Sequence, residues 1–111
     1  MKVTIDNKEY EINYNLRTLM VYENKFKQSF EPKLLTDIIN FFYAGVILDD
    51  VRKGNPTIIY DDFIDWLEDN PFILVEFVTW LAGVMNANNL ATKEQSTKIE
   101  KEETVKKKIK S

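Results

Sequence analysis

Residues 70–86 read NPFILVEFVTWLAGVMN, and this stretch carries the strongest structural signal in the chain. Asparagine is favoured at the N-cap of a helix and proline at its first position, so a helix is predicted to begin at Asn70-Pro71. Its polar positions form one narrow strip, and the rest of its circumference is apolar. Because a surface helix of a small protein normally has a wet half, the predicted helix over residues 71–86 is unusually apolar.

Three more helices are predicted upstream. Asn15 can cap a helix over residues 16–27. The next helix, residues 35–48, is almost entirely apolar, and a short acidic helix follows at residues 61–68. Between these two, residues 49–56 are predicted to form a polar loop. The first of the three helices is expected to bury one apolar stripe, which consists of Leu16, Leu19, Met20 and Phe26.

The first fourteen residues alternate between apolar and polar side chains, which is typical of strands. They predict a β-hairpin over residues 2–14 with a polar turn at residues 6–8. Lys8 is a poor occupant of a two-residue turn, so a looser turn is an alternative. A lone hairpin is barely stable in water, so its apolar face should lie on helices. The predicted fold is therefore α+β and mostly α: an N-terminal β-hairpin packed on a small bundle of about four helices.

Charge divides the 111-residue chain into two parts. Residues 1–91 carry 8 basic and 14 acidic side chains, whereas residues 92–111 carry seven lysines and four glutamates. We therefore expect a single globular domain over residues 1–90 and a charged C-terminal tail, a frayed helix, over residues 91–111. An acidic body disfavours nucleic-acid binding, because phosphate contacts need a basic face.

The composition leaves few routes to catalysis. Cysteine and histidine are absent, which removes disulfides, Cys/His zinc sites, haem ligation and triads that rely on a thiol or an imidazole. The acidic cluster at residues 61–69 lacks the glycine and the spacing of a calcium loop. Gly45 and Gly83 lie inside predicted helices, where close helix packing or a kink would explain them. No enzyme activity and no catalytic, cofactor-binding or metal-binding residue is therefore predicted.

Neither a signal peptide nor a membrane span is expected. The N-terminus alternates and lacks an apolar core. The longest apolar stretches, residues 38–48 and 72–85, fall short of the roughly 20 residues that cross a bilayer. We expect the protein to be soluble and intracellular.

Two of the predicted helices, residues 35–48 and 71–86, carry more apolar surface than a small bundle easily covers. On either interpretation below, six residues should be mostly buried within one copy or its interfaces: Leu19, Phe26, Phe42, Phe63, Trp66 and Trp80. One interpretation is a tight core with these two helices at its centre. The other is that part of the apolar arc binds a partner or a second copy of the chain. Aromatic residues and methionine are enriched at interfaces, so the candidate partner-binding residues are Phe77, Trp80 and Met85.

The order of short segments is also informative. They are KVTIDNKEYEI at residues 2–12, LRTLMVYE at 16–23, SFEP at 29–32, FYA at 42–44, YDDFIDWL at 60–67 and then Asn70-Pro71. This order resembles the tail assembly chaperone family of long-tailed, siphovirus-like bacteriophages and prophages, over about residues 1–90. Relatives often have glycine in the hairpin turn and after the first helix, where this chain has Asn7-Lys8 and FKQS at residues 26–29.

The resemblance implies a non-catalytic role in viral tail assembly. Such chaperones coat the tape measure protein, keep it extended and soluble, and help to recruit tail-tube subunits. They act in the host bacterial cytoplasm and are not expected in the mature virion. In this family a longer form, made by programmed ribosomal frameshifting, often contacts the tail-tube protein. From the apolar arc of the helix over residues 71–86 we expect self-association or client binding, so a homo-oligomer is possible, whereas nucleic acid and membranes are not expected partners.

The C-terminal Lys106-Lys107-Lys108 would be encoded by a run of adenines, on which a ribosome can change frame. The alternative is a solubilising basic tail. For the whole chain, the alternative function is a small intracellular adaptor or inhibitor that acts through helix-mediated protein–protein binding. A carboxylate-based enzyme or metal binder is the third hypothesis.

Overall fold

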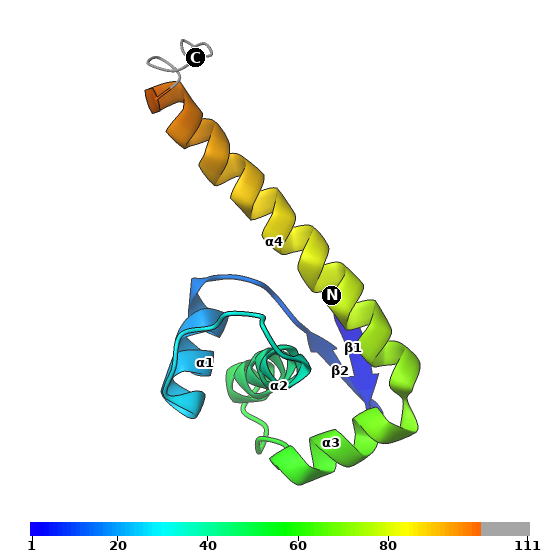
Figure 1. Ribbon diagram of the computed structural model, residues 1–111. Helices are drawn as coiled ribbons and strands as arrows, with labels where there is room; N and C mark the ends of the chain where they lie inside the picture. The colour runs from blue at the N-terminus through cyan, green and yellow to red at the C-terminus, as the bar shows by residue number, and fades with distance from the viewer. Residues whose placement is uncertain (101–111) are drawn as a thin grey trace. The chain divides into compact units, whose positions relative to one another are not determined.

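The computed structural model describes the backbone of residues 1–100 and the side chains of residues 1–87. Its elements are β1 (Lys2–Ile5), β2 (Lys8–Glu11), α1 (Leu16–Phe26), α2 (Leu35–Arg52), α3 (Tyr60–Asp69) and α4 (Pro71–Glu100), as Figure 1 shows. The predicted class is confirmed: an N-terminal hairpin and four helices make an α+β, mostly α fold. The chain divides into two compact units, the first covering Met1–Trp80 and the second starting at Leu81.

The hairpin turns more tightly than the looser alternative. β1 and β2 pair antiparallel, with Ile5 opposite Lys8, so only Asp6 and Asn7 lie between the strands. Both turn residues have a positive φ, 49° and 68°. Asparagine and aspartate tolerate this left-handed conformation better than other non-glycine residues, which explains why no glycine is needed here. Lys8 therefore belongs to the second strand and not to the turn.

The apolar side chains of the predicted hairpin are Val3, Ile5, Tyr10, Ile12 and Tyr14; the first four are buried, whereas Tyr14 is half-buried. The buried face lies on α2, where Gly45 makes the closest approach. A Cβ atom on Gly45 would lie 2.7 Å from Cγ2 of Ile12. The close packing expected at this glycine is therefore between the helix and the hairpin, and not between two helices.

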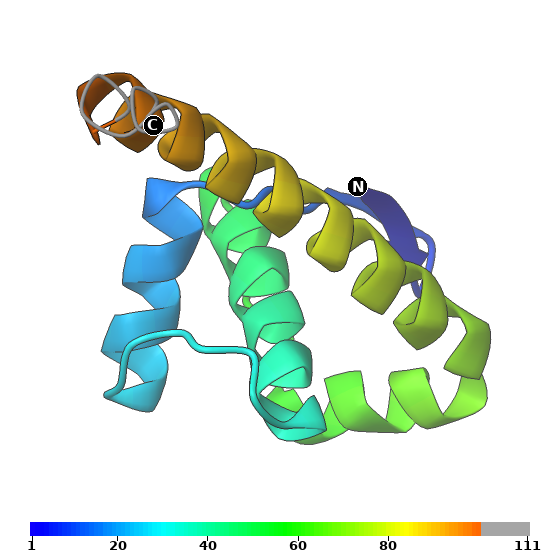
Figure 2. The same cartoon turned by 45° about the horizontal axis from the view of Figure 1, so that its top comes forward.

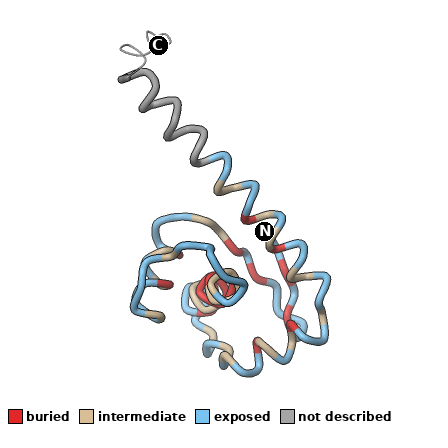
Figure 3. Tube along the Cα trace, in the orientation of Figure 1, coloured by how far each residue is buried: buried red, intermediate tan, exposed pale blue. Residues whose placement is uncertain are grey.

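α2 is the central element of the first unit. Six consecutive residues, Phe41–Val46, are buried. Figure 3 shows this run in red within α2, which is viewed end-on. The helix continues to Arg52, so the predicted loop at residues 49–56 begins too early. Asp49 and Asp50 are helical and buried, and Oδ2 of each carboxylate accepts a hydrogen bond from a backbone N–H of another segment.

Aromatic rings hold the first unit together. The ring of Phe42 stacks on that of Phe77, with centroids 4.2 Å apart and planes 11° apart. Phe63 meets Phe42 edge-on at 5.1 Å, which ties α3 to the same cluster. Of the predicted core residues, Phe42 and Phe63 are fully buried, whereas the other four are half-buried: Leu19, Phe26, Trp66 and Trp80.

The predicted buried stripe of α1 is wrong in two of its four residues. Leu16 is 73% exposed and Met20 is 59% exposed. The buried residues of α1 are Thr18 and Tyr22, and this face packs against α2, which lies beside α1 in Figures 1 and 2. Thr18 can be buried because its hydroxyl donates to Oδ1 of Asn15 at 3.0 Å. Asn15 also accepts from the backbone N–H of Thr18, which confirms its predicted role as N-cap.

α4 continues to Glu100, so the helix does not end near Asn86 as predicted. Residues 101–111, with the lysine run at 106–108, lie outside the described residues. Within the described residues, no single helix is long and apolar enough to span a bilayer. One pair of helical segments reaches that length and composition together, but the two helices meet at a bend of 102°: Tyr60–Asp69 and Pro71–Ala87.

Candidate protein-binding site

One cluster of titratable groups consists of the buried carboxylates beneath the hairpin. Oδ2 of Asp49 accepts from the backbone N–H of Glu11 at 3.3 Å and pairs with Nζ of Lys53 at 2.8 Å. Oδ2 of Asp50 accepts from the backbone N–H of Ile58 at 3.2 Å. These contacts join the C-terminal end of α2 to β2 and to the segment before α3. Oδ1 of Asp50 is buried and has no hydrogen-bond partner among the described residues.

Tyr10 lies next to this cluster and is almost fully buried. Burial, followed by the acceptor oxygens and negative charge of Asp50, raises the pKa of Tyr10 to about 12. The hydroxyl therefore stays protonated at neutral pH and is not poised to act as a base.

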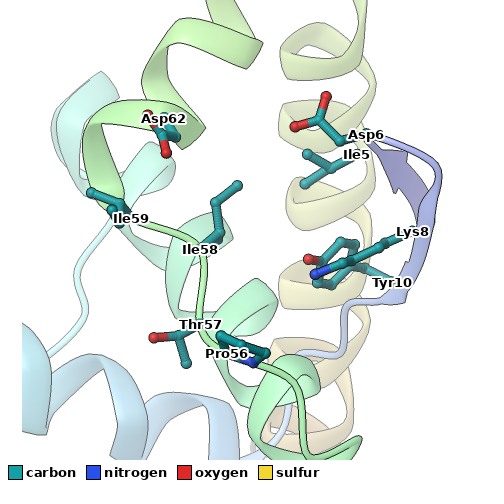
Figure 4. A pocket seen from close by; sticks show the side chains of 9 residues that line it. All are labelled: Ile5, Asp6, Lys8, Tyr10, Pro56, Thr57, Ile58, Ile59 and Asp62. Carbon is teal, nitrogen blue, oxygen red and sulfur yellow. The ribbon is translucent and has the colours of Figure 1, made fainter.

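A pocket of about 270 Å³ opens between the hairpin and the segment 56–59 (Figure 4). Its charged side chains are Asp6, Lys8 and Asp62, and Tyr10 lies beside Lys8.

Exposed apolar side chains are the most unusual surface feature. Monomeric proteins expose single apolar residues routinely, but contiguous patches mark binding surfaces. Among the described side chains, those of residues 1–87, eight large apolar ones are more than half exposed: Leu16, Met20, Leu34, Leu35, Val51, Ile59, Phe72 and Val75. Those that lie next to further apolar surface can form part of a contiguous patch.

Three helices meet around one apolar pocket of about 300 Å³, which we name the α3–α4 groove. α2 contributes one residue, α3 contributes three, and the first turn of α4 contributes two: Ile39, Ile64, Leu67, Glu68, Pro71 and Leu74. Apart from Glu68, all these side chains are apolar. The groove thus combines a concave shape with the composition of a protein-binding site.

The connection between α3 and α4 creates this groove. Asn70 is the only residue between the two helices, and its side-chain Nδ2 donates to the carbonyl oxygen of Trp66 at 2.9 Å. Pro71 then starts α4 at once, because its fixed φ suits the first helical position. The short link places Leu67 and Leu74 in the same groove.

Exposed apolar residues continue the groove at two margins. On α4, Phe72 is 80% exposed and Val75 is 63% exposed, and each is next to a groove residue in the sequence. On α2, the exposed Leu35 is one helical turn before Ile39, so the two residues share a helix face. We name Leu35, Phe72 and Val75 the apolar margin.

The charges carried by α3 and the first turns of α4 have a single sign. Residues 54–92 contain no lysine or arginine and six carboxylates, at positions 61, 62, 65, 68, 69 and 76. Glu68 lines the groove itself, and the other five carboxylates belong to exposed residues of α3 and α4. The prediction of a solvated acidic face on α3 is therefore confirmed. The described residues contain no group of three or more His, Cys, Asp or Glu side chains that could hold a metal ion.

Of the three candidate partner-binding residues, Phe77 needs correction. It is fully buried because it lies on the inward face of α4, stacked on Phe42, and so it cannot meet a partner as part of an exposed arc. Trp80 is half-buried, with its ring 5.4 Å from that of Phe77. Met85, in the second unit, is half-buried as well. Partner binding by Trp80 and Met85 stays a prediction.

The sequence analysis missed the residues of the groove and its apolar margin. One signal was available: Phe72 and Val75 lie three residues apart, on the opposite side of the helix from Phe77.

Scans of the chain against protein-family models, curated proteins and solved structures found no match.

Proposed function

We propose that this chain is a non-catalytic phage tail assembly chaperone that binds the tape measure protein through the α3–α4 groove and its apolar margin. In this proposal it keeps the tape measure protein soluble in the host cytoplasm. A longer, frameshifted form would recruit the tail-tube subunits. The proposal combines the segment order of the sequence with the exposed apolar surface of the first unit.

The observation that carries the proposal is the apolar surface itself. The first unit has a buried aromatic core, so the exposed Phe72, Val75 and Leu35 are not needed to hold it together. A chaperone that shields an apolar client needs this combination, a stable scaffold with spare apolar surface. The net negative charge of the body limits nonspecific association of that surface.

The experiment is co-expression with the cognate tape measure protein, which the proposal expects to be the product of a very long helical reading frame immediately downstream of the gene for this chain. We expect the tape measure protein to be soluble with the wild-type chain and insoluble without it. Phe72→Ser combined with Val75→Ser should reduce the soluble fraction several-fold. Leu16→Ser combined with Met20→Ser is the matched control, because it removes the same kind of exposed apolar surface from α1.

The result that would overturn the proposal is a tape measure protein whose solubility does not depend on this chain. Equal loss with both double variants would place the binding surface elsewhere. Thermal melting of each variant shows whether the first unit is still folded, so that a folding defect is not read as a binding defect.

A further inference from the structure

We propose that the α3–α4 groove binds an amphipathic helix whose apolar stripe is flanked by lysine or arginine. This inference rests on the proposed function and names the chemistry of the client segment. Three observations carry it, namely the origin of the groove walls, the size of the groove and the charge around it.

The walls of the groove come only from helices. Its lining belongs to α2, α3 and α4, so no unpaired strand edge borders it. An extended segment could not add itself as a strand here, because that mode needs free backbone N–H and C=O groups at a sheet edge. A helix, in contrast, can present side chains while its own backbone groups are satisfied. The groove therefore fits the helix-in-groove mode.

The size of the groove sets the pattern of the partner. A volume of about 300 Å³ receives the side chain of one central anchor and not a whole helix. Further contacts must come from the apolar margin, with Phe72 and Val75 on one side and Leu35 on another. Anchors of a docked helix recur at positions i, i+3 or i+4, and i+7. We therefore expect large apolar side chains at that spacing in the bound segment.

The carboxylates near the groove determine which charge is favourable beside the apolar stripe of the bound helix. Glu68 lines the groove, and Asp61, Asp65 and Glu76 are exposed carboxylates of α3 and α4. The segment that forms α3 and the first turns of α4, residues 60–76, contains no lysine or arginine. A helix with acidic flanks would be repelled, whereas one with basic flanks would gain Coulomb energy and a faster association rate. Charge thus selects a basic amphipathic helix over an acidic or neutral one.

The test uses three synthetic helical peptides with identical apolar positions and with Lys, Gln or Glu at the flanking positions. Binding to the full chain is measured by fluorescence anisotropy. We expect the Lys peptide to bind about tenfold more tightly than the Glu peptide. The difference should shrink at about 0.5 M salt, because the Debye length falls well below its physiological value. Equal affinity of the three peptides would overturn the proposal.

Charge reversal provides the matched variants. Glu68→Lys reverses a charge in the groove, and Asp69→Lys makes the same change at an exposed neighbour that does not line it. We expect Glu68→Lys to weaken the Lys peptide and strengthen the Glu peptide. Asp69→Lys should change both affinities much less. Equal effects of the two substitutions would mean that net charge, and not the groove, selects the peptide, which would overturn the proposal.

A second copy of the chain is the competing occupant. Light scattering with and without Val75→Ser distinguishes it: a wild-type dimer that this substitution converts to a monomer, and that no peptide displaces, would overturn the proposal.

The proposed chaperone function and the proposed preference for a basic helix can fail separately. If the tape measure protein stays soluble but the peptides bind equally, only the charge inference is wrong. If the Lys peptide is preferred but the tape measure protein aggregates, only the chaperone function is wrong.

Discussion

Gly45 allows the hairpin to approach α2 closely, because it has no Cβ atom. The nearest atom to a Cβ at this position is Cγ2 of Ile12, and Ile12 is fully buried, so its side chain has little room to move away. Tight packing of this kind makes an added methyl group costly. At Gly83, in contrast, no atom lies within 4 Å of the added Cβ.

The first prediction compares these two glycines. Gly45→Ala should lower the free energy of unfolding by about 1–3 kcal/mol, because the clash outweighs the gain in helix propensity. Gly83→Ala should stabilise the helix by up to about 1 kcal/mol. Urea unfolding followed by circular dichroism measures both. Stabilisation by Gly45→Ala would mean that the hairpin does not rest on α2 as described.

The second prediction concerns Tyr10 at alkaline pH. Its pKa is about 12 in the folded chain and about 10 when unfolded, so the folded state favours the neutral phenol. The unfolded state releases its proton first, and stability should fall as the pH rises from 10 to 12, by roughly 2–3 kcal/mol. Urea midpoints across this range measure the fall. Tyr10→Phe should show a shallower decline, with the remainder due to Tyr43 and Tyr60, whose pKa values are also raised by burial. Identical slopes would exclude Tyr10 as the source.

At the scale of elements, α1 illustrates what the sequence could and could not predict. Its cap at Asn15 was predictable, because the capping hydrogen bonds are local. Its buried face was not, because hydrophobicity alone favours Leu16 and Met20 over Thr18 and Tyr22. Tyr22 is buried because other segments surround its ring: Phe30 is 5.1 Å away and Phe41 6.4 Å away between centroids. Those neighbours exist only in the folded chain.

The third prediction follows from the orientation of α1. Tyr22→Ala should lower the free energy of unfolding by about 3–5 kcal/mol, since it removes a fully buried ring. Leu16→Ala should change it by less than about 0.5 kcal/mol, because that side chain is mostly exposed. Thermal melting measures the contrast. Similar losses in the two variants would show that α1 is rotated from the orientation described here.

The boundaries of α2 illustrate the same limit on prediction. Two consecutive aspartates normally indicate a loop, and the predicted helix accordingly ended at Leu48. Asp50 is buried nevertheless, because the backbone N–H of Ile58 reaches its carboxylate from the next segment. The fold class was predictable from periodicity, whereas a partner eight residues away was not.

At the scale of the whole first unit, one side of α4 packs into the core and another side is exposed to solvent. Phe77 faces inward and stacks on Phe42, and Phe72 faces solvent beside the α3–α4 groove. The groove was not predictable from the sequence, because its lining comes from three helices and depends on how they cross. The sequence indicated only that α4 has more apolar surface than one core can use.

The fourth prediction separates these two sides of α4. Phe77→Ala should lower the free energy of unfolding by about 3–5 kcal/mol, because it removes a buried ring. Phe72→Ala should leave the melting temperature nearly unchanged and reduce the amount of soluble tape measure protein. Melting curves and the co-expression assay together measure the contrast. A large melting shift from Phe72→Ala would mean that this ring belongs to the core.

The single residue that connects α3 to α4 has a kinetic consequence. Groove residues on both sides of Asn70 belong to helices that are already formed, so no loop has to close over an incoming helix. Association without such a step proceeds at about 10⁵–10⁷ M⁻¹s⁻¹. At micromolar affinity the bound state would then last about 0.1–10 s. If the chain acts as the proposed chaperone, exchange on this timescale would let one copy leave each client segment as soon as the growing tube covers it.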